Sequence, residues 1–381
     1  MRLRGAAFIL LFCCAGVLAT LSKSSRKQAP KVDPTEEQSK SESAKLKKEI
    51  LQSHSELDAG DRTFSSGPTF GYVTPWNNHG YDVAKWAAKK FTHIVPVWFQ
   101  INALTKFDRK TCTVAGTHDM DQGWIADIRS NNSDVKIVPR FLFENWNPQD
   151  LEDFLVDEGW QIRCGKDLAN FILRNQFDGA VLEVWIQIMS MTRGQAGQMV
   201  TELIEEWTET FHKKNLLVVI PIPPPLRDTN EDTGLFSPVY LERLVRKVDY
   251  VNVMTYDFPS TKATGVAPYY WVQSNLDWLL DAGIEHNRIL MGINFYGYDR
   301  TEGRMDAIVS SKYLELLGRN DVRIEWDDSV KEHRLRWGSK GIAYYPTLLS
   351  MQKRLDLATQ MQVGLAVWDL GQGLDHFTKL L

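Results

Sequence analysis

From residue 69 to the end of the chain, short apolar runs alternate about eight times with amphipathic segments. Continuous apolar runs of this length are typical of buried parallel strands, and they cover residues 69–73, 93–99, 136–143, 179–185, 216–222, 250–256, 289–296 and 364–369. Segments with the 3.6-residue period of a helix lie between them, at residues 83–90, 166–174, 199–213, 239–247, 272–282 and 347–361. This alternation predicts an α/β fold, specifically a (β/α)8 TIM barrel.

One connection is too long for a simple barrel loop. Residues 301–341 precede the last helix and strand, and apolar residues alternate within them around Trp326 and Trp337. We therefore expect a small α+β insertion there, within one barrel domain that covers residues 68–381. A doubly wound sheet is the competing fold, but no glycine-rich phosphate loop opens any of the helices.

The segment before residue 68 differs in character from the rest. Residues 1–19 resemble a signal peptide, with Arg2 and Arg4 ahead of an apolar stretch and small residues before position 20. This predicts the secretory pathway, with a secreted or lysosomal destination. Residues 20–67 are rich in Ser, Lys and Glu and predict a polar, flexible arm, with at most a short surface helix over residues 43–57.

The charge and the cysteine content restrict the kinds of partner and of covalent cross-link that the chain can have. The 44 basic and 48 acidic residues give a net charge of −4, which argues against a nucleic-acid partner. No later apolar stretch reaches the length of a membrane span, and no spacing of residues indicates a metal or a cofactor. Cys112 and Cys164 follow the signal segment and allow one disulfide, which the sequence leaves open. Asn131 begins an N-glycosylation acceptor.

Aromatic and acidic residues gather where the predicted strands end. The chain has 17 Phe, 13 Trp and 12 Tyr, and sites in these barrels lie at the carboxyl ends of the strands. Flat rings beside a few hydrogen-bonding groups suit the faces and hydroxyls of sugars. The candidate ligand-binding residues are Tyr72, Trp76, Glu144, Trp146, Glu183, Trp185, Tyr256, Asp257, Tyr296 and Trp368.

Three motifs resemble glycoside hydrolase family 18, in particular its chitinase-like lectins. They are Asp178-Gly179 before an apolar strand, Met254-Thr255-Tyr256-Asp257, and a last strand that ends in Trp368. The resemblance implies oligosaccharides such as chito-oligomers and amino sugars as ligands. It also implies that Tyr256 and Asp257 hydrogen-bond the N-acetyl group and hydroxyls, that Trp368 lies under the central sugar, and that a stabilin-type scavenger receptor is a partner.

One departure from the family pattern bears on activity. The family reads D-G-x-D-x-D-x-E, whereas this chain has Val181 at the second Asp, Glu183 at the third and Trp185 at the proton-donating Glu. Residues two apart on a strand are displaced by about 6.6 Å, and proton transfer needs heavy atoms within roughly 3 Å. Glu183 therefore lies about one layer too deep, and we expect no hydrolysis by the family route.

These observations favour a non-catalytic lectin for N-acetylated or amino-sugar oligosaccharides. The expected ligands extend to bacterial glycolipids such as lipopolysaccharide, with a role in innate recognition. Two alternatives stay open at this point. One is a weak or atypical glycoside hydrolase that uses Glu144 or Asp257, and the other is a receptor-binding scaffold without a sugar function.

Overall fold

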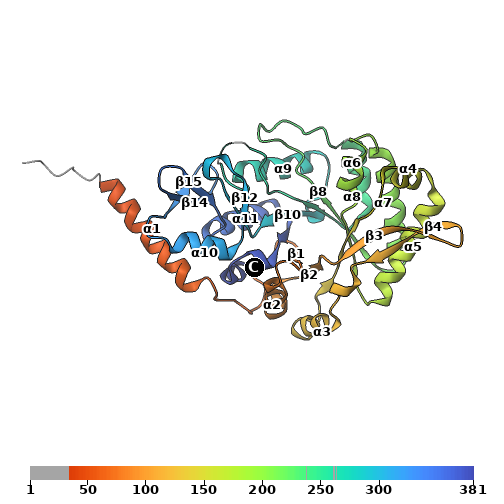
Figure 1. Cartoon of the computed structure of the whole chain (residues 1–381), viewed down its shortest axis with the longest axis horizontal. Helices are drawn as coiled ribbons and strands as arrows, with labels where there is room; N and C mark the ends of the chain where they lie inside the picture. Colours follow the sequence, from red (N-terminus) through yellow and green to blue (C-terminus); the bar gives the residue numbers. More distant parts are fainter. Residues whose placement is uncertain (1–33, 237, 261, 263) are drawn as a thin grey trace, which may run out of the picture.

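The computed structural model describes residues 34–381 except 237, 261 and 263. The expected signal peptide and residues 20–33 of the expected arm lie outside the described residues. The rest forms a barrel with a small second sheet at one end and a long helix beside that sheet (Figure 1). No helix among the described residues is long and apolar enough to cross a membrane.

The predicted eight-stranded barrel is confirmed. Two of the eight strands are each interrupted and form two segments, β2 (His93–Pro96) with β3 (Phe99–Lys106) and β5 (Lys136–Ile137) with β6 (Arg140–Phe143). The other six are β1 (Thr69–Val73), β7 (Gly179–Leu182), β8 (Leu217–Ile222), β9 (Tyr250–Val253), β10 (Ile289–Asn294) and β16 (Gly364–Trp368). Neighbouring strands follow the order β3-β6-β7-β8-β9-β10-β16-β1-β2-β5 and run parallel. Since β2 leads directly into β3, and β5 into β6, the two ends of this sheet meet and the sheet curls closed.

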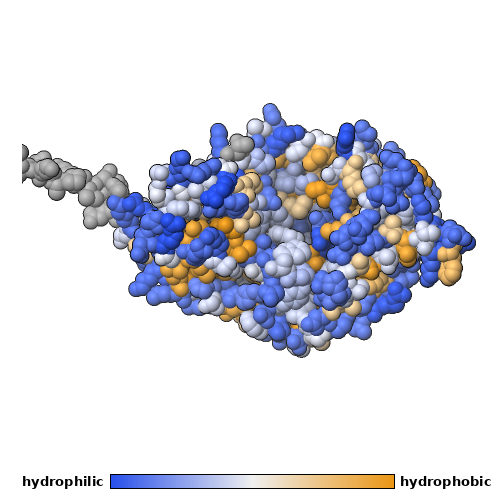
Figure 2. Space-filling model, viewed as in Figure 1, coloured by the Kyte–Doolittle hydropathy of each residue, from blue (hydrophilic) through white to orange (hydrophobic). Residues whose placement is uncertain are grey.

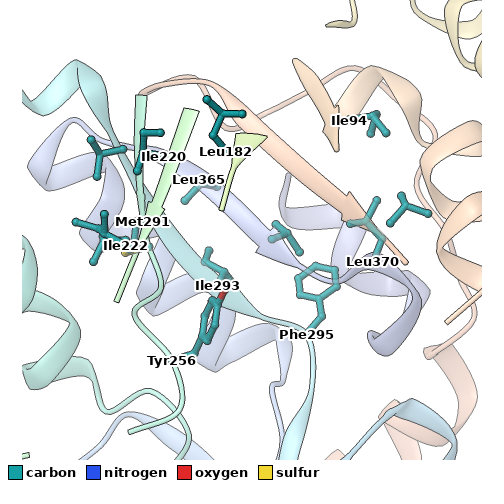
Figure 3. Close-up of a cluster of buried hydrophobic side chains, with 14 of the residues drawn as sticks. Ile94, Leu182, Ile220, Ile222, Tyr256, Met291, Ile293, Phe295, Leu365 and Leu370 are labelled. Carbon is teal, nitrogen blue, oxygen red and sulfur yellow. The ribbon is translucent and has the colours of Figure 1, made fainter. Parts of the chain in front are cut away.

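Alternate residues of each strand serve two different cores, as the two-residue period of a strand requires. On β8, Val219 faces the barrel interior with Val181 and Leu290. Its neighbours Ile220 and Ile222 belong to the layer between the strands and the helices, part of which is shown in Figure 3. The barrel is therefore a packed core rather than a channel, and polar side chains inside it require an explanation.

Helices surround the barrel. They are α2 (His79–Trp86), α3 (Gln122–Asn131), α4 (Pro148–Val156), α5 (Glu158–Arg174), α6 (Trp185–Met191), α7 (Gly197–His212), α8 (Pro238–Lys247), α9 (Tyr269–Asp281) and α11 (Leu348–Met361). The sequence reasoning missed α3, α4 and α6. These helices are short and lie in stretches that we interpreted as connections, where the helical period has too few turns to stand out.

The predicted α+β insertion is confirmed. It is an antiparallel sheet in the order β12 (Asp306–Ile308), β11 (Gly297–Asp299), β15 (Gly341–Tyr344), β14 (Glu332–Trp337) and β13 (Arg323–Asp327), with helix α10 (Ser310–Gly318). The buried Glu332 carboxylate of this sheet accepts hydrogen bonds from the backbone N–H groups of Val266 and Ala267 and from Arg354. The two backbone hydrogen bonds attach the insertion to the loop that follows β9, and the ion pair attaches it to α11.

Residues 34–67 of the predicted polar, flexible arm pack against the rest of the protein, and their helix is longer than the predicted segment 43–57. Helix α1 (Pro34–Ser53) packs against β13 and α10, with Ile50 buried (Figure 1). Beyond the helix, Asp58 pairs with the fully buried ammonium group of Lys90 at 2.7 Å. The segment carries few apolar residues, but the helix places them on one face, which a composition argument overlooks.

A second structure that the sequence did not predict is the hairpin of β3 with β4 (Arg109–Ala115). Strand β4 pairs antiparallel with β3 from Gln100 to Lys106 and forms the edge of the sheet. Cys112 on β4 forms a disulfide with Cys164 on α5, the pairing that the sequence left open. The disulfide and α5 together cover the edge strand.

Candidate functional site

The centre of the barrel mouth is occupied by an ion pair. Arg140 begins β6 and Glu183 directly follows β7, and their side chains meet with Nη1 of Arg140 2.8 Å from Oε2 of Glu183. The Arg140 side chain is 10% exposed and that of Glu183 is 27% exposed. The Glu183 side chain thus points inward, and its carboxylate accepts a hydrogen bond from the Arg140 guanidinium.

Three further side chains lie in this layer. Asn252 on β9 donates from Nδ2 to the hydroxyl of Tyr72 on β1 at 2.8 Å. The partly exposed ring of Trp368, at the end of β16, tilts over Tyr72 with the ring centres 5.4 Å apart. The predicted residues Tyr72 and Trp368 thus lie in contact with each other, whereas Arg140 and Asn252, which lie beside them, were not among the predicted residues.

Two buried polar atoms in this layer are unpaired. Nε of Arg140, a donor, and Oδ1 of Asn252, an acceptor, find no hydrogen-bond partner among the described residues. Leaving such atoms unpaired costs about 1–3 kcal/mol each. Since buried polar groups are normally satisfied, these two atoms indicate that water or a polar ligand completes the layer.

A second cluster surrounds the carboxylate of Asp257, just beyond β9. The hydroxyls of Tyr296 and Tyr298 both donate to its Oδ1, the latter at 2.6 Å. Asp257 has a positive φ of 59°, a conformation in which Asp is tolerated better than most residues. Burial, with a further contribution from the Asp257 charge, raises the pKa of Tyr296, so this tyrosine stays a neutral donor.

Tyr256 links the two clusters. Its ring lies edge-on to Tyr296 with the ring centres 6.1 Å apart, and its side chain points into the group of strand residues seen in Figure 3. Burial raises the pKa of Tyr256 well above its ordinary value, and the neighbouring Tyr72 and Asp257 add to this rise. The structure therefore brings together six of the predicted residues around one mouth: Tyr72, Glu183, Tyr256, Asp257, Tyr296 and Trp368.

A cavity of about 340 Å³ opens beside this mouth. Its walls come from the segment after β8, from Tyr256 and Asp257, and from Trp271 on α9. Figure 2 shows a hollow over this part of the molecule, bordered by apolar and hydrophilic surface. The cavity is mainly apolar, and the Asp257 carboxylate and the Arg227 side chain supply its charged groups.

The expectation that Trp185 lines the centre of the mouth is wrong. Strand β7 ends at Leu182, so Trp185 begins α6 instead of continuing the strand. Its ring is 5% exposed and stacks on Phe236 with the ring centres 4.5 Å apart. One face of the Trp185 ring is thus covered by another aromatic ring.

The remaining candidates lie apart from this layer. Trp146 is packed rather than open, since it stacks on Trp160 and donates from Nε1 to the Ile101 carbonyl. Glu144 is exposed, and Trp76 is 64% exposed on the segment after β1. Asn131 is exposed at the end of α3, and its amide donates to the Lys85 carbonyl, a hydrogen bond that an attached glycan would have to replace.

The polar groups at the mouth determine which ligands it can bind. The described residues contain no group of three or more His, Cys, Asp or Glu that could hold a metal ion. The carboxylates are those of Glu183, held by Arg140, and Asp257, held by two tyrosines. Both are arranged as acceptors, and with the Trp368 ring they suit a ligand that has hydroxyl or amide donors and an apolar face.

Comparison with known proteins shows a family and a shared fold. The family model "Glycosyl hydrolases family 18" matches residues 68–373. Among curated proteins, the chain is similar to the "Uncharacterized glycosylase YvbX" of Bacillus subtilis, with 23% identity over 191 residues that cover 48% of this chain and 55% of the relative. The chain thus spans about half the length of the curated relatives it matches.

Solved structures share the fold. The spore cortex-lytic enzyme SleL of Bacillus megaterium superposes with a TM-score of 0.65 at 18% identity, over 85% of this chain and 74% of that one. A chitinase variant of Cycas revoluta in complex with (GlcNAc)4 gives a TM-score of 0.65 at 16% identity, over 82% of this chain and 97% of that one. At such identities the likeness establishes the barrel fold alone. These relatives are named as a glycosylase, a spore cortex-lytic enzyme and a chitinase, and not as the chitinase-like lectins that the sequence suggested.

Proposed function

Because the chain belongs to glycosyl hydrolase family 18, we propose that its barrel mouth binds N-acetylated or amino-sugar oligosaccharides without hydrolysing them. The ion pair of Arg140 with Glu183 carries this proposal. A carboxylate that is paired with a guanidinium serves as an acceptor, whereas the family route needs a carboxylic acid that gives its proton to the leaving oxygen. The residue at the position of that acid is Trp185, whose indole N–H is far too weak an acid to protonate a leaving oxygen.

The rest of the mouth supports sugar binding. Trp368 offers a ring, and Asp257 offers a carboxylate oriented by two tyrosines. The unpaired Nε of Arg140 and Oδ1 of Asn252 are a donor and an acceptor, a pair that complements the carbonyl and the N–H of an acetamido group. Each of these features favours binding, and none of them requires chemistry.

Titration with chito-oligosaccharides, followed by tryptophan fluorescence, tests the proposal. Trp368→Ala should weaken binding about tenfold or more, because aromatic contacts contribute about 0.5–1.5 kcal/mol beyond the buried area that is also lost. Tyr256→Phe is a milder control that keeps the ring. If folded Trp368→Ala binds as tightly as the parent, the proposed site is wrong and a scaffold without sugar function becomes the better account.

A second candidate function is an atypical glycoside hydrolase. The relatives favour it, since their names describe a glycosylase and a cortex-lytic enzyme. The chain also keeps exposed carboxylates at Glu144 and Asp257. Turnover of a fluorogenic chito-oligosaccharide by the parent, abolished in Glu144→Gln or Asp257→Asn, would establish this function and overturn the non-catalytic one.

We keep three finer expectations as proposals. They are the secretory destination, binding of lipopolysaccharide in innate recognition, and a stabilin-type receptor as partner. The last two can be tested with the purified protein, by titration with lipopolysaccharide and with the receptor ectodomain.

A further inference from the structure

The tip of the β3–β4 hairpin presents a large apolar side chain to solvent. Phe107 is 89% exposed, the highest value among the large exposed hydrophobic residues described. Leu104, three residues earlier on β3, is also exposed, at 39%. In Figure 1 the hairpin extends beyond the barrel and its helices at one end of the molecule. Single exposed apolar residues are common, so the exposure of Phe107 does not by itself indicate a binding site.

The backbone conformation at the tip is also unusual. Phe107 and Asp108 are the two residues between the paired strands, and both have positive φ, 49° and 61°. A two-residue turn of this kind favours Asn-Gly or Asp-Gly, and a positive φ is unusual for a bulky residue such as Phe. Phe107 is therefore unfavourable in this turn. Residues in such strained backbone conformations are often found at functional sites.

The charges beside the ring are mainly positive. Lys106 and Arg109 flank the turn and are paired across it, and the Lys106 ammonium lies 5.8 Å from the centre of the Phe107 ring. Neither side chain forms a salt bridge with any other residue in the described part of the chain. Asp108 is the one carboxylate of the tip, so residues 106–109 carry one net positive charge.

The base of the hairpin is held firmly, in contrast to the tip. Cys112 is bonded to Cys164, Lys110 pairs with Asp153 at 2.7 Å, and its ammonium lies 4.7 Å from the centre of the Trp160 ring. Trp160 also donates from Nε1 to the Thr111 carbonyl. The fold thus holds the tip at a fixed position, which lowers the entropy cost of placing Phe107 in a binding partner.

We propose that the tip of the β3–β4 hairpin docks on an anionic lipid surface, with Phe107 entering the apolar layer and Lys106 and Arg109 against the phosphates. An exposed aromatic ring among cations is the combination that interfacial segments use. A narrow two-residue tip also needs no complementary pocket in its partner. Since β3 runs parallel to β6, the tip lies at the same end of the barrel as the mouth.

Co-sedimentation of the whole protein with vesicles tests this proposal. Binding should occur with vesicles of phosphatidylcholine and phosphatidylserine, fall with added salt, and be weaker with phosphatidylcholine alone. Phe107→Ala should reduce the partition coefficient about tenfold or more. Lys106→Gln and Arg109→Gln should each reduce it about fivefold at low salt, and Asp108→Asn should increase it.

The turn itself provides a matched control. The double change Phe107→Asn with Asp108→Gly suits the backbone of this turn, so it should raise the melting temperature while it removes vesicle binding. Trp86→Ala removes another exposed ring, 50% exposed on α2, and should leave vesicle binding unchanged. No binding to either vesicle, or equal binding by Phe107→Ala, would overturn the proposal.

Discussion

Nη1 of Arg140 donates a 2.8 Å hydrogen bond to Oε2 of Glu183 between two adjacent strands at the barrel mouth. The pair connects a basic residue that the sequence did not predict at the mouth to one of the predicted carboxylates. Its consequences for stability can be measured independently of any ligand.

Arg140→Gln should lower the free energy of unfolding by about 1–3 kcal/mol, because it leaves the Glu183 carboxylate without its charged donor. Glu183→Gln should cost less, since the amide oxygen can still accept from Arg140. Urea denaturation of both variants checks this order. If Glu183→Gln proves the more destabilising change, the carboxylate has partners other than Arg140.

Trp185→Glu should not produce hydrolysis of a chito-oligosaccharide and should lower the melting temperature. The new carboxylate would replace a ring that is 5% exposed and stacked on Phe236, and a buried charge without a partner is costly. Trp185→Phe keeps an aromatic ring against Phe236 and should be much less destabilising. Turnover by the Glu variant would show that this position reaches the bound sugar.

Ile50→Ala should lower the free energy of unfolding by about 2–4 kcal/mol, as expected for a buried aliphatic residue. Ile50 is 4% exposed on the face of α1 that packs on the insertion. The adjacent Leu51 is 38% exposed, so Leu51→Ala is the matched control and should be nearly neutral. Equal effects of the two changes in thermal or urea unfolding would mean that α1 contributes nothing by docking.

Stability should fall on acidification below about pH 6.5. Burial lowers the pKa of His93 to about 3 and those of His333 and His376 to about 4, with Lys136 and Arg62 adding to the effect on His93. The folded state keeps these histidines neutral, whereas the unfolded chain binds protons below pH 6.5. Each histidine therefore removes about 1.4 kcal/mol per pH unit between its two pKa values.

Urea unfolding at several pH values between 7 and 4 checks this dependence. Glu332 and Asp369, whose pKa values are raised by burial, act in the opposite direction and reduce the slope. His376→Gln should flatten the curve relative to the parent. An unchanged slope in that variant would show that His376 is protonated in the folded state.

The barrel could be predicted from the sequence because its signal is repeated. Each apolar strand is weak evidence by itself, but eight in alternation with helices fit few other folds. The same repetition located Tyr256 and Trp368, since residues at strand ends must lie at one end of a parallel barrel.

Arg140 and Asn252 could not be found in this way, because a polar residue inside a strand carries no sign of which partner satisfies it. The predicted position of Trp185 at the mouth was wrong for a related reason. Its assignment to the mouth assumed that β7 continues through residue 185, whereas the chain turns into α6 after Val184. The docking of α1 depends on a surface that exists only after the insertion has folded.

The backbone N–H and the hydroxyl of Thr63 both donate to the carbonyl of Leu381, at 2.9 and 3.0 Å, and the next strand, β1, pairs with β16. Leu381 therefore lies against the segment that leads into β1, and a short glycine linker could join it to Thr63 in a variant that lacks residues 1–62 and with them α1. New ends opened between Phe107 and Asp108 would break no strand pairing. Such a circular permutant should fold to the same barrel, with its mouth intact and its two ends at the tip of the β3–β4 hairpin.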